Sequence, residues 1–552
     1  MASVSHAIKA IRDSHSARVG CLLALGLITT SCGDVYRPVA QIVPGTPPNP
    51  SAVHFVETVS ANGKLNTGSG SRLDVAGDTN LGNLQTGVQP AHAALIQNAS
   101  KLYIANFGDD TVTENAPSNP TVTSTIGLPA GSQPVFVHSA ESNNVYVANF
   151  GTGTVSVINA NSNAVTTSVP VGANPVALAE MPSTGSTNQK LYVANEGSSS
   201  VSVINVLDDS LGSAINVGAP QVWAVARSDS ARIYVLDSSG TISAINTLSD
   251  SVMPPTASAG AGANFMFLDS KAQRLYVTNP IAHTLSIFDI TEATPTPVSH
   301  LVTLDLSQSA SPAYIPTSVT GIGDGSRAYV ASYQLTSCPA LSGSFACVNT
   351  AVSVINVGTN SVSKIVPIAS AVPVDTNNND GCGGIAPPPA LWTPSVGTRF
   401  RLSTASSGGG STSNFKVYVA QCDAQDIAVL DTFPANSNPA DTYTGVTVPA
   451  PLSAASGQQV SISGATQTAA TSTTPATTTY AYTQTAGSGL QVGMSIFVSG
   501  MTDTGNNGNF VITALASGMF TVDNPSGVTN SAQSGTGSVL PRQSPVFVVA
   551  GT

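Results

Sequence analysis

A seven-residue pattern recurs along this chain of 552 residues and limits the folds that it can adopt. Leu102–Gly108 reads LYIANFG, and Val145–Gly151 repeats it as VYVANFG. The copies are marked by a Tyr, which stands at Tyr103, Tyr146, Tyr192, Tyr234, Tyr276, Tyr329 and Tyr418. The first four steps between these Tyr residues are about 42 to 46 residues, a period that indicates one repeated supersecondary unit.

Each unit also reads as a set of short strands. A second run follows most copies, such as Val155–Asn159 and Val201–Asn205, both with the sequence VSVIN. Alternation of this kind places apolar side chains on one face of a strand. Gly- and Asn-rich tetrads between the two runs are typical of hairpin turns. With two further short strands in each period, the pattern predicts four antiparallel strands per unit, which is the blade of a propeller.

These runs resemble a known family of repeats. Tyr-Val-Ala/Thr-Asn followed by Val-Ser-Val-Ile-Asn/Asp is similar to the YVTN β-propeller repeat of bacterial surface and periplasmic proteins. The resemblance covers roughly residues 53–450 and implies an all-β propeller of four-stranded blades. It implies little about function, because one fold carries many functions.

The number of blades follows from the two chain ends. A degenerate eighth unit precedes the seven Tyr units, with His54–Glu57 as its first run and Arg72–Ala76 as its second. This unit lacks a leading strand, and Pro545–Val549 resembles Pro134–Val137, which opens another blade. We therefore predict eight blades, closed by N- and C-terminal strands that share one blade. Seven blades, with residues 53–85 as a partial outer addition, are the alternative.

Two segments interrupt the period within the predicted propeller of residues 53–455, and a third follows it. Insertions at 333–350 and 368–413 carry three of the four cysteines beyond residue 32, and such loops either bind a ligand or are pinned without one. Residues 456–541 contain strand-like runs that predict a small all-β module, a barrel or a sandwich. The closing strand of the propeller is then expected within 542–552.

The N-terminus predicts export. Residues 1–31 combine basic residues with a short apolar stretch, as a signal peptide does. Thr29–Gly33 resembles a bacterial lipoprotein cleavage box, which implies lipid attachment at Cys32, and residues 32–52 form a Pro-rich spacer. We expect a lipid-anchored protein of the bacterial cell envelope, at the outer membrane or the periplasmic face. Ordinary cleavage, with Cys32 left as a thiol, would instead give a secreted protein.

Cysteine usage agrees with export. Four cysteines remain after the spacer, an even number that favours disulfides. Cys338 and Cys347 bracket one loop and are expected to pair within it, and Cys382 with Cys422 would form the other bridge. Sequence alone does not fix this connectivity.

Two groups of residues are candidate ligand sites. Asp375, Asn377, Asn379 and Asp380 carry the oxygen ligands that calcium prefers. Gly381 comes one residue later than the glycine of an EF-hand loop, and the closing Glu is missing, so an Asn-rich turn is the alternative.

His92 and His138 are the second group, because they fall in successive blades on strands that approach the central channel of a propeller. A metal site there needs further ligands, and the sequence shows no cluster of them. Packing, or contact with channel water, is the other interpretation. The acidic pairs Asp109–Asp110 and Asp208–Asp209 are expected to be solvated turn residues.

Composition and the absence of certain motifs limit the classes of function that we expect. The net charge is −11 and charged residues are only 9% of the chain, so the basic surface of a nucleic-acid-binding protein is not expected. The sequence contains no G-x-S-x-G, H-E-x-x-H, P-loop or C-x-x-C-H motif. We expect a monomeric, non-enzymatic lipoprotein whose rigid propeller binds protein or glycan, with calcium as the only suggested cofactor. The alternative is a propeller enzyme, lactonase- or dehydrogenase-like, with its site at a mouth of the channel.

Overall fold

The computed structural model describes residues 55–550 with internal gaps. The gaps are residues 64–66, 97–98, 117–122, 141–142, 182–188, 230, 292–295, 338–345, 375–380, 385–386, 389, 392–400, 409–414, 434–439, 448–458, 472–475, 487–488, 491–494 and 541–543. The signal peptide, Cys32 and the spacer therefore lie outside the described residues. Within the described ranges, no helix is both long and apolar enough to cross a membrane.

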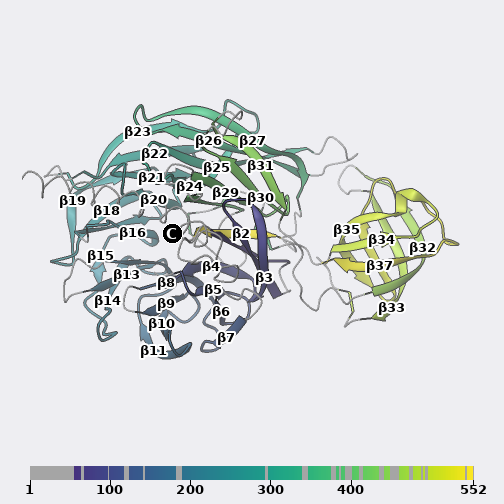
Figure 1. Cartoon of the computed structure of the whole chain (residues 1–552), viewed down its shortest axis with the longest axis horizontal. Coiled ribbons are helices and arrows are strands. Elements are labelled where there is room, and N and C mark those ends of the chain that lie inside the picture. Colours follow the sequence, from purple (N-terminus) through teal and green to yellow (C-terminus); the bar gives the residue numbers. More distant parts are fainter. Residues whose placement is uncertain are drawn as a thin grey trace, which may run out of the picture. The chain divides into compact units, whose positions relative to one another are not determined.

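Most described strands belong to eight four-stranded antiparallel sheets, the blades of a propeller (Figure 1). Blade 1 contains β38 (Pro545–Ala550), β1 (Phe55–Ser60), β2 (Thr67–Asp74) and β3 (Thr79–Val88). Blade 2 contains β4 (Pro90–Leu95), β5 (Leu102–Asn106), β6 (Thr111–Asn115) and β7 (Thr123–Gly127). Blade 3 contains β8 (Pro134–Ser139), β9 (Asn144–Asn149), β10 (Thr154–Asn159) and β11 (Ala164–Pro170). Blade 4 contains β12 (Pro175–Glu180), β13 (Lys190–Asn195), β14 (Ser200–Asn205) and β15 (Ile215–Asn216).

The other four blades follow in chain order. Blade 5 contains β16 (Gln221–Ala226), β17 (Arg232–Asp237), β18 (Thr241–Asn246) and β19 (Ser251–Ser258). Blade 6 contains β20 (Phe265–Asp269), β21 (Arg274–Asn279), β22 (Thr284–Asp289) and β23 (Ser299–Asp305). Blade 7 contains β24 (Ile315–Gly321), β25 (Arg327–Ser337), β26 (Ala346–Asn356) and β27 (Ser361–Pro373). Blade 8 contains β28 (Leu402–Gly408), β29 (Phe415–Gln421), β30 (Asp426–Asp431) and β31 (Thr442–Thr447).

The blades form a closed ring. The leading strand of each blade contacts the leading strand of the next, in the cycle β4, β8, β12, β16, β20, β24, β28, β38 and back to β4. In blade 1 the two ends of the described chain pair antiparallel, with Val56 opposite Ala550 and Val59 opposite Phe547. The prediction of eight blades closed by N- and C-terminal strands is therefore confirmed.

The repeated strands are buried because blades pack on both of their faces. In β9 (NVYVAN) every residue after Asn144 is buried, and Tyr146 is fully buried. The alternating β10 pairs with it in register from Thr154 opposite Asn149 to Asn159 opposite Asn144. Apolar side chains on both faces of these strands thus form the contacts that hold neighbouring blades together.

In several blades the repeat Tyr also links its blade to the next through a hydrogen bond. The hydroxyls of Tyr146 and Tyr192 donate to Asp209 and Asp250 respectively, both over 2.7 Å. Each acceptor lies in the turn between the third and fourth strands of the following blade and has a positive φ, a conformation that Asp adopts more readily than most residues. Asp209 is therefore an acceptor between blades, and its prediction as a solvated turn residue was wrong.

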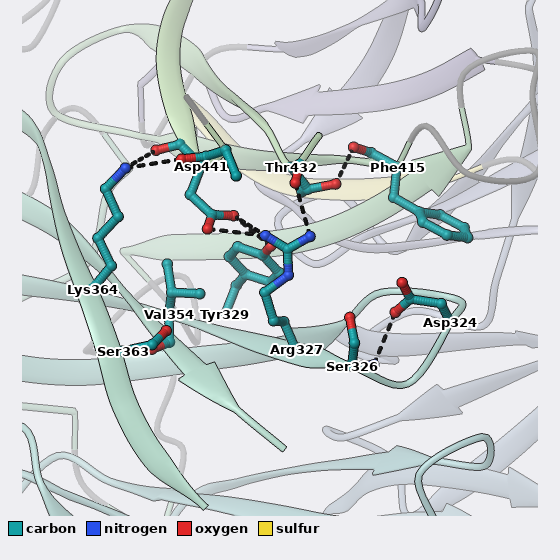
Figure 2. Close-up of polar contacts among 11 residues, drawn as sticks. Asp324, Ser326, Arg327, Tyr329, Val354, Ser363, Lys364, Phe415, Thr432 and Asp441 are labelled. Atoms are coloured by element: carbon teal, nitrogen blue, oxygen red, sulfur yellow. Dashed lines mark hydrogen bonds and ion pairs between the residues drawn. The ribbon is translucent and has the colours of Figure 1, made fainter. Parts of the chain in front are cut away.

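Blades 7 and 8 show the fullest form of this contact (Figure 2). Tyr329 donates to Asp441 Oδ1 over 2.7 Å, and Arg327 NH1 donates to both carboxylate oxygens over 2.8 and 2.9 Å. Lys364 Nζ donates to the backbone oxygen of Asp441 over 3.0 Å. Burial raises the pKa of Tyr329 above its ordinary value, so the hydroxyl stays a neutral donor.

Residues 456–541 contain a separate closed barrel. Its strand order is β32 (Gln459–Thr468), β33 (Thr477–Ala486), β36 (Met519–Asp523), β35 (Gly508–Ala516), β34 (Ser495–Ser499) and β37 (Gly535–Leu540). One turn of 3-10 helix, η2 (Thr504–Asn506), precedes β35. Val460, Tyr480, Ile496 and Phe520 belong to a core of its own. The predicted all-β module is thus a barrel, and β38 after it returns to the propeller.

The two predicted insertions are partly strand. Residues 333–337 and 346–350 continue β25 and β26 as one long hairpin, from Tyr333 opposite Thr350 to Ser337 opposite Ala346. The ends of segment 368–413 belong to β27 and to β28, the leading strand of blade 8. The sequence boundaries were too wide because β28 is rich in Ser and lacks the apolar run that marks other leading strands.

Candidate functional site

The leading strands of all eight blades surround one cavity of about 390 Å³. Its wall includes His92 from β4, Phe136 from β8, Trp223 from β16 and Phe547 from β38. Ser318 from β24 and Ser403 from β28 lie on it as well. The cavity is therefore the central channel of the propeller.

One residue from each leading strand lies at the same level of this channel. His92 is paired with Ala105, Phe136 with Ala148 and Trp223 with Leu236, in each case two residues after the repeat Tyr. Corresponding positions in the other blades complete what we call the channel layer: Phe547, His92, Phe136, Ala177, Trp223, Phe265, Ser318 and Ser403. In six of the leading strands a β-bulge precedes the layer residue, and bulges of this kind redirect the side chain that follows.

Aromatic rings occupy most of the layer. His92 stacks on Phe136 with 3.9 Å between ring centroids, and Phe547 lies 4.5 Å from His92 on a tilted plane. Phe136 meets Trp223 edge to face at 5.7 Å, and Trp223 lies 4.8 Å from Phe265. Blade 4 contributes only Ala177 here, which leaves room for Phe136 and Trp223 to touch. Blades 7 and 8 contribute the hydroxyls of Ser318 and Ser403, so the layer has an aromatic arc and a hydroxyl arc.

A histidine–carboxylate pair stands on the same cavity wall. His138 Nε2 and Glu180 Oε2 are 3.0 Å apart, and their side chains are 28% and 5% exposed. The distance is that of a hydrogen bond between the imidazole and the carboxyl group, whose donor is set by the tautomer of His138. Glu180, from the end of β12, was not singled out by its sequence context, because the residue that it contacts belongs to the preceding blade.

The structure places both predicted histidines on the channel but not at equivalent positions. The register makes His92 equivalent to Phe136, whereas His138 is paired with Tyr146, one pleat further along its strand. Among the described residues, no three His, Cys, Asp or Glu side chains come together as a metal site would require. Asp375, Asn377, Asn379 and Asp380 lie outside the described residues, so calcium binding there stays a prediction.

A disulfide fixes the second insertion to blade 8. Cys382 is bonded to Cys422, which follows β29, as one of the expected pairings has it. Beside it, Arg401 NH1 contacts both oxygens of Asp423 over 2.9 and 3.0 Å, and Arg401 NH2 donates to Gly383 O over 2.9 Å. Both side chains of this ion pair are only 3% exposed. Cys347 is also disulfide-bonded, and Cys338, its expected partner, lies outside the described residues.

The second insertion lies between blades 7 and 8 in the chain but also contacts other blades. Cys382 belongs to a buried cluster with Val59 of blade 1 and Ile104 of blade 2. Ala390 packs against a second cluster, which includes Phe136 and Trp223. The described part of the insertion therefore contacts the same apolar cluster as the aromatic arc of the channel layer.

Acidic side chains in turns between strands have structural partners. Asp110 accepts hydrogen bonds from the backbone N–H groups of Gly131 and Gln133 over 2.7 and 2.8 Å. These two residues connect blade 2 to blade 3, so Asp110, a partly exposed turn residue, also orients that connection. Asp426 accepts a hydrogen bond from Gln421 Nε2 over 2.6 Å, and burial raises its pKa to about 6.

The fold and the channel together define the class of the protein as an eight-bladed β-propeller. No protein family and no curated protein matches the chain. Solved structures similar to it include Kuenenia stuttgartiensis hydrazine synthase, at 17% identity and a TM-score of 0.38, over 55% of this chain and 78% of that one.

A β-propeller domain of Cps50 (Swd1) from Myceliophteria thermophila matches at 9% identity and a TM-score of 0.40, over 50% of this chain and 85% of that one. The dihydro-heme d1 dehydrogenase NirN matches at 14% identity and a TM-score of 0.37, over 60% and 77%. At these identities the likeness concerns the fold alone.

Proposed function

We propose that this protein is an exported, non-enzymatic binding propeller of the bacterial cell envelope, tethered through a lipid on Cys32. The observation that carries the proposal is the buried Cys382–Cys422 disulfide. Disulfides persist in oxidising compartments such as the periplasm and the cell surface and are rare in the cytosol. The signal-like N-terminus, the cleavage box and the Pro-rich spacer support the same location.

The binding role rests on how firmly the insertion is held. The disulfide and the Arg401–Asp423 ion pair fix one end of the insertion to a ring whose blades are joined by Tyr–Asp contacts. Loops positioned by a rigid scaffold are common binding elements. We expect the partner, an envelope protein or a glycan, to contact the insertion near Leu391, which is exposed in the described structure.

Site-specific photo-crosslinking in intact cells tests this role. A photoreactive amino acid at Leu391 is expected to give a discrete crosslinked product that depends on Cys32 and on oxidised Cys382 and Cys422. The matched control is the same probe at Leu248, which is 93% exposed in the turn between β18 and β19. Equal crosslinking at both positions, or none at Leu391, would contradict the proposal.

A propeller enzyme remains the second candidate because of one observation, the His138–Glu180 pair on the channel wall. A carboxylate that orients an imidazole is the usual support of a histidine general base. This candidate predicts turnover that His138→Gln abolishes, measured on lactone and alcohol substrates with the full chain. Such turnover would replace the non-enzymatic proposal.

A further inference from the structure

The central channel is built as a pocket for a small molecule. Its volume of about 390 Å³ lies within the range of pockets that enclose small ligands. It is surrounded by eight strands whose register is fixed by pairing within each blade, so its wall is pre-formed. Pre-formed apolar pockets with a few placed polar groups are typical binding sites.

The wall selects for a flat apolar ligand. Phe136, Trp223, Phe265 and Phe547 supply aromatic surface, and Leu178 and Met266 add aliphatic surface. Aromatic rings attract another ring in offset or edge-to-face contact, a preference that a planar ligand satisfies. Phe136 and Trp223 already use this geometry with each other.

The polar groups on the wall are few. Ser318, Ser403 and Thr404 offer hydroxyls, and Thr404 donates to Ser318 over 3.2 Å. His138 and Glu180 contact each other, and among the described residues of the wall His92 is the only other titratable one. A charged ligand would therefore enter an apolar pocket with no free opposite charge, which is costly.

We infer that the channel binds a small neutral aromatic molecule that carries a hydroxyl or ring N–H group, of the size of a phenol, an indole or a naphthol. The ring of the ligand lies against the aromatic arc. Its polar group hydrogen-bonds to His138. This inference does not depend on the envelope location or on the partner proposed above.

Isothermal titration calorimetry on the oxidised chain from residue 33 onward, with 2-naphthol and indole as probes, tests the inference. We expect 1:1 binding with a Kd on the order of 10–500 µM for at least one probe. Phe136→Leu removes ring contacts, and His138→Gln changes the polar group at nearly constant size; each should weaken binding about tenfold. His300→Gln is the matched control, because His300 is exposed on the outer strand β23, and it should bind as the wild type does.

Thermal unfolding verifies that each variant is folded. If Phe136→Leu does not fold, Val225→Phe replaces it, because the larger side chain narrows the cavity from β16 and should weaken binding at least tenfold. The inference is overturned if neither probe binds the wild type, or if the channel variants bind as tightly as His300→Gln does. Tighter binding of glucose than of both probes would also overturn it, since it would show a sugar site instead.

Discussion

The Tyr329 hydroxyl of blade 7 lies 2.7 Å from Asp441 Oδ1 of blade 8, so a side chain that defines the repeat also joins neighbouring repeats. The same contact connects Tyr146 to Asp209 and Tyr192 to Asp250. The Tyr of this repeat thus has two roles, as core and as inter-blade donor. The period of this Tyr in the sequence therefore marks contacts between neighbouring blades as well as the blades themselves.

One Tyr provides an internal control for the strength of this contact. Among the described residues, neither the buried hydroxyl of Tyr276 nor Oδ1 of Asn360, in the corresponding turn of blade 7, has a hydrogen-bond partner. Tyr329→Phe should lower the free energy of unfolding by about 1–2 kcal/mol, because it removes a hydrogen bond to a charged group. Tyr276→Phe should change it by less than about 0.5 kcal/mol, because no bond is lost. Urea denaturation of both variants checks the difference, and equal losses would contradict the account.

Asp426 makes stability depend on pH in a defined direction. Burial raises its pKa in the folded protein to about 6, from an ordinary value of 3.8. Its contribution to stability is therefore fully present below about pH 4 and is lost as the pH rises through 6. Asp426→Asn should be more stable than the wild type by about 1–2 kcal/mol at pH 8, with little difference at pH 4. Unfolding curves at the two pH values measure this, and a larger benefit at pH 4 would reverse the predicted sign.

The Cys382–Cys422 bridge should contribute substantially to stability. It spans 40 residues of sequence, and closure of a loop of this size in the unfolded chain corresponds to about 3–4 kcal/mol. Cys382→Ala/Cys422→Ala should therefore unfold at a clearly lower denaturant concentration than the oxidised wild type. Reduced wild type also loses the bridge at Cys347, so it should unfold at the same or a lower denaturant concentration than the oxidised double variant. If the oxidised wild type and the double variant unfold at the same denaturant concentration, the bridge does not stabilise the fold.

The buried Arg401–Asp423 pair should behave as a unit. Arg401→Met leaves the Asp423 carboxylate buried without its cation and should cost about 3–5 kcal/mol. Arg401→Met/Asp423→Leu removes both charges and should recover most of that loss. A double-mutant cycle measures the coupling. Additive losses in the double variant would argue against a coupled pair.

The architecture was predictable because its signals are local. Hairpin turns, alternating runs and the Tyr period each act within about 45 residues, and blade 1 was recognisable from two short runs near the chain ends. The pairing of His92 with Ala105 and of Phe136 with Ala148, in contrast, depends on β-bulges, which change the register by one residue without an obvious sequence signal.

Contacts between distant residues account for the rest of what the sequence did not predict. Arg401 and Asp423 are surrounded by ordinary loop residues, and only the fold brings them together with the disulfide. Glu180 lies at the end of one leading strand and contacts His138 of another. No spacing in the sequence therefore indicates this pair. Propeller channels combine single residues from every blade, and this explains why the site was less predictable than the fold.

The location of the mature chain tests the central claim most directly. The full chain is expressed in a Gram-negative bacterium, the membrane fraction is isolated, and mass spectrometry identifies the N-terminal peptide and the thiol state of Cys422. The account predicts a membrane-bound chain that begins at a lipid-modified Cys32 and contains the Cys382–Cys422 disulfide, whereas Cys32→Ala should not be lipid-modified. A cytoplasmic chain that retains residues 1–31 and has a free thiol at Cys422 would contradict it.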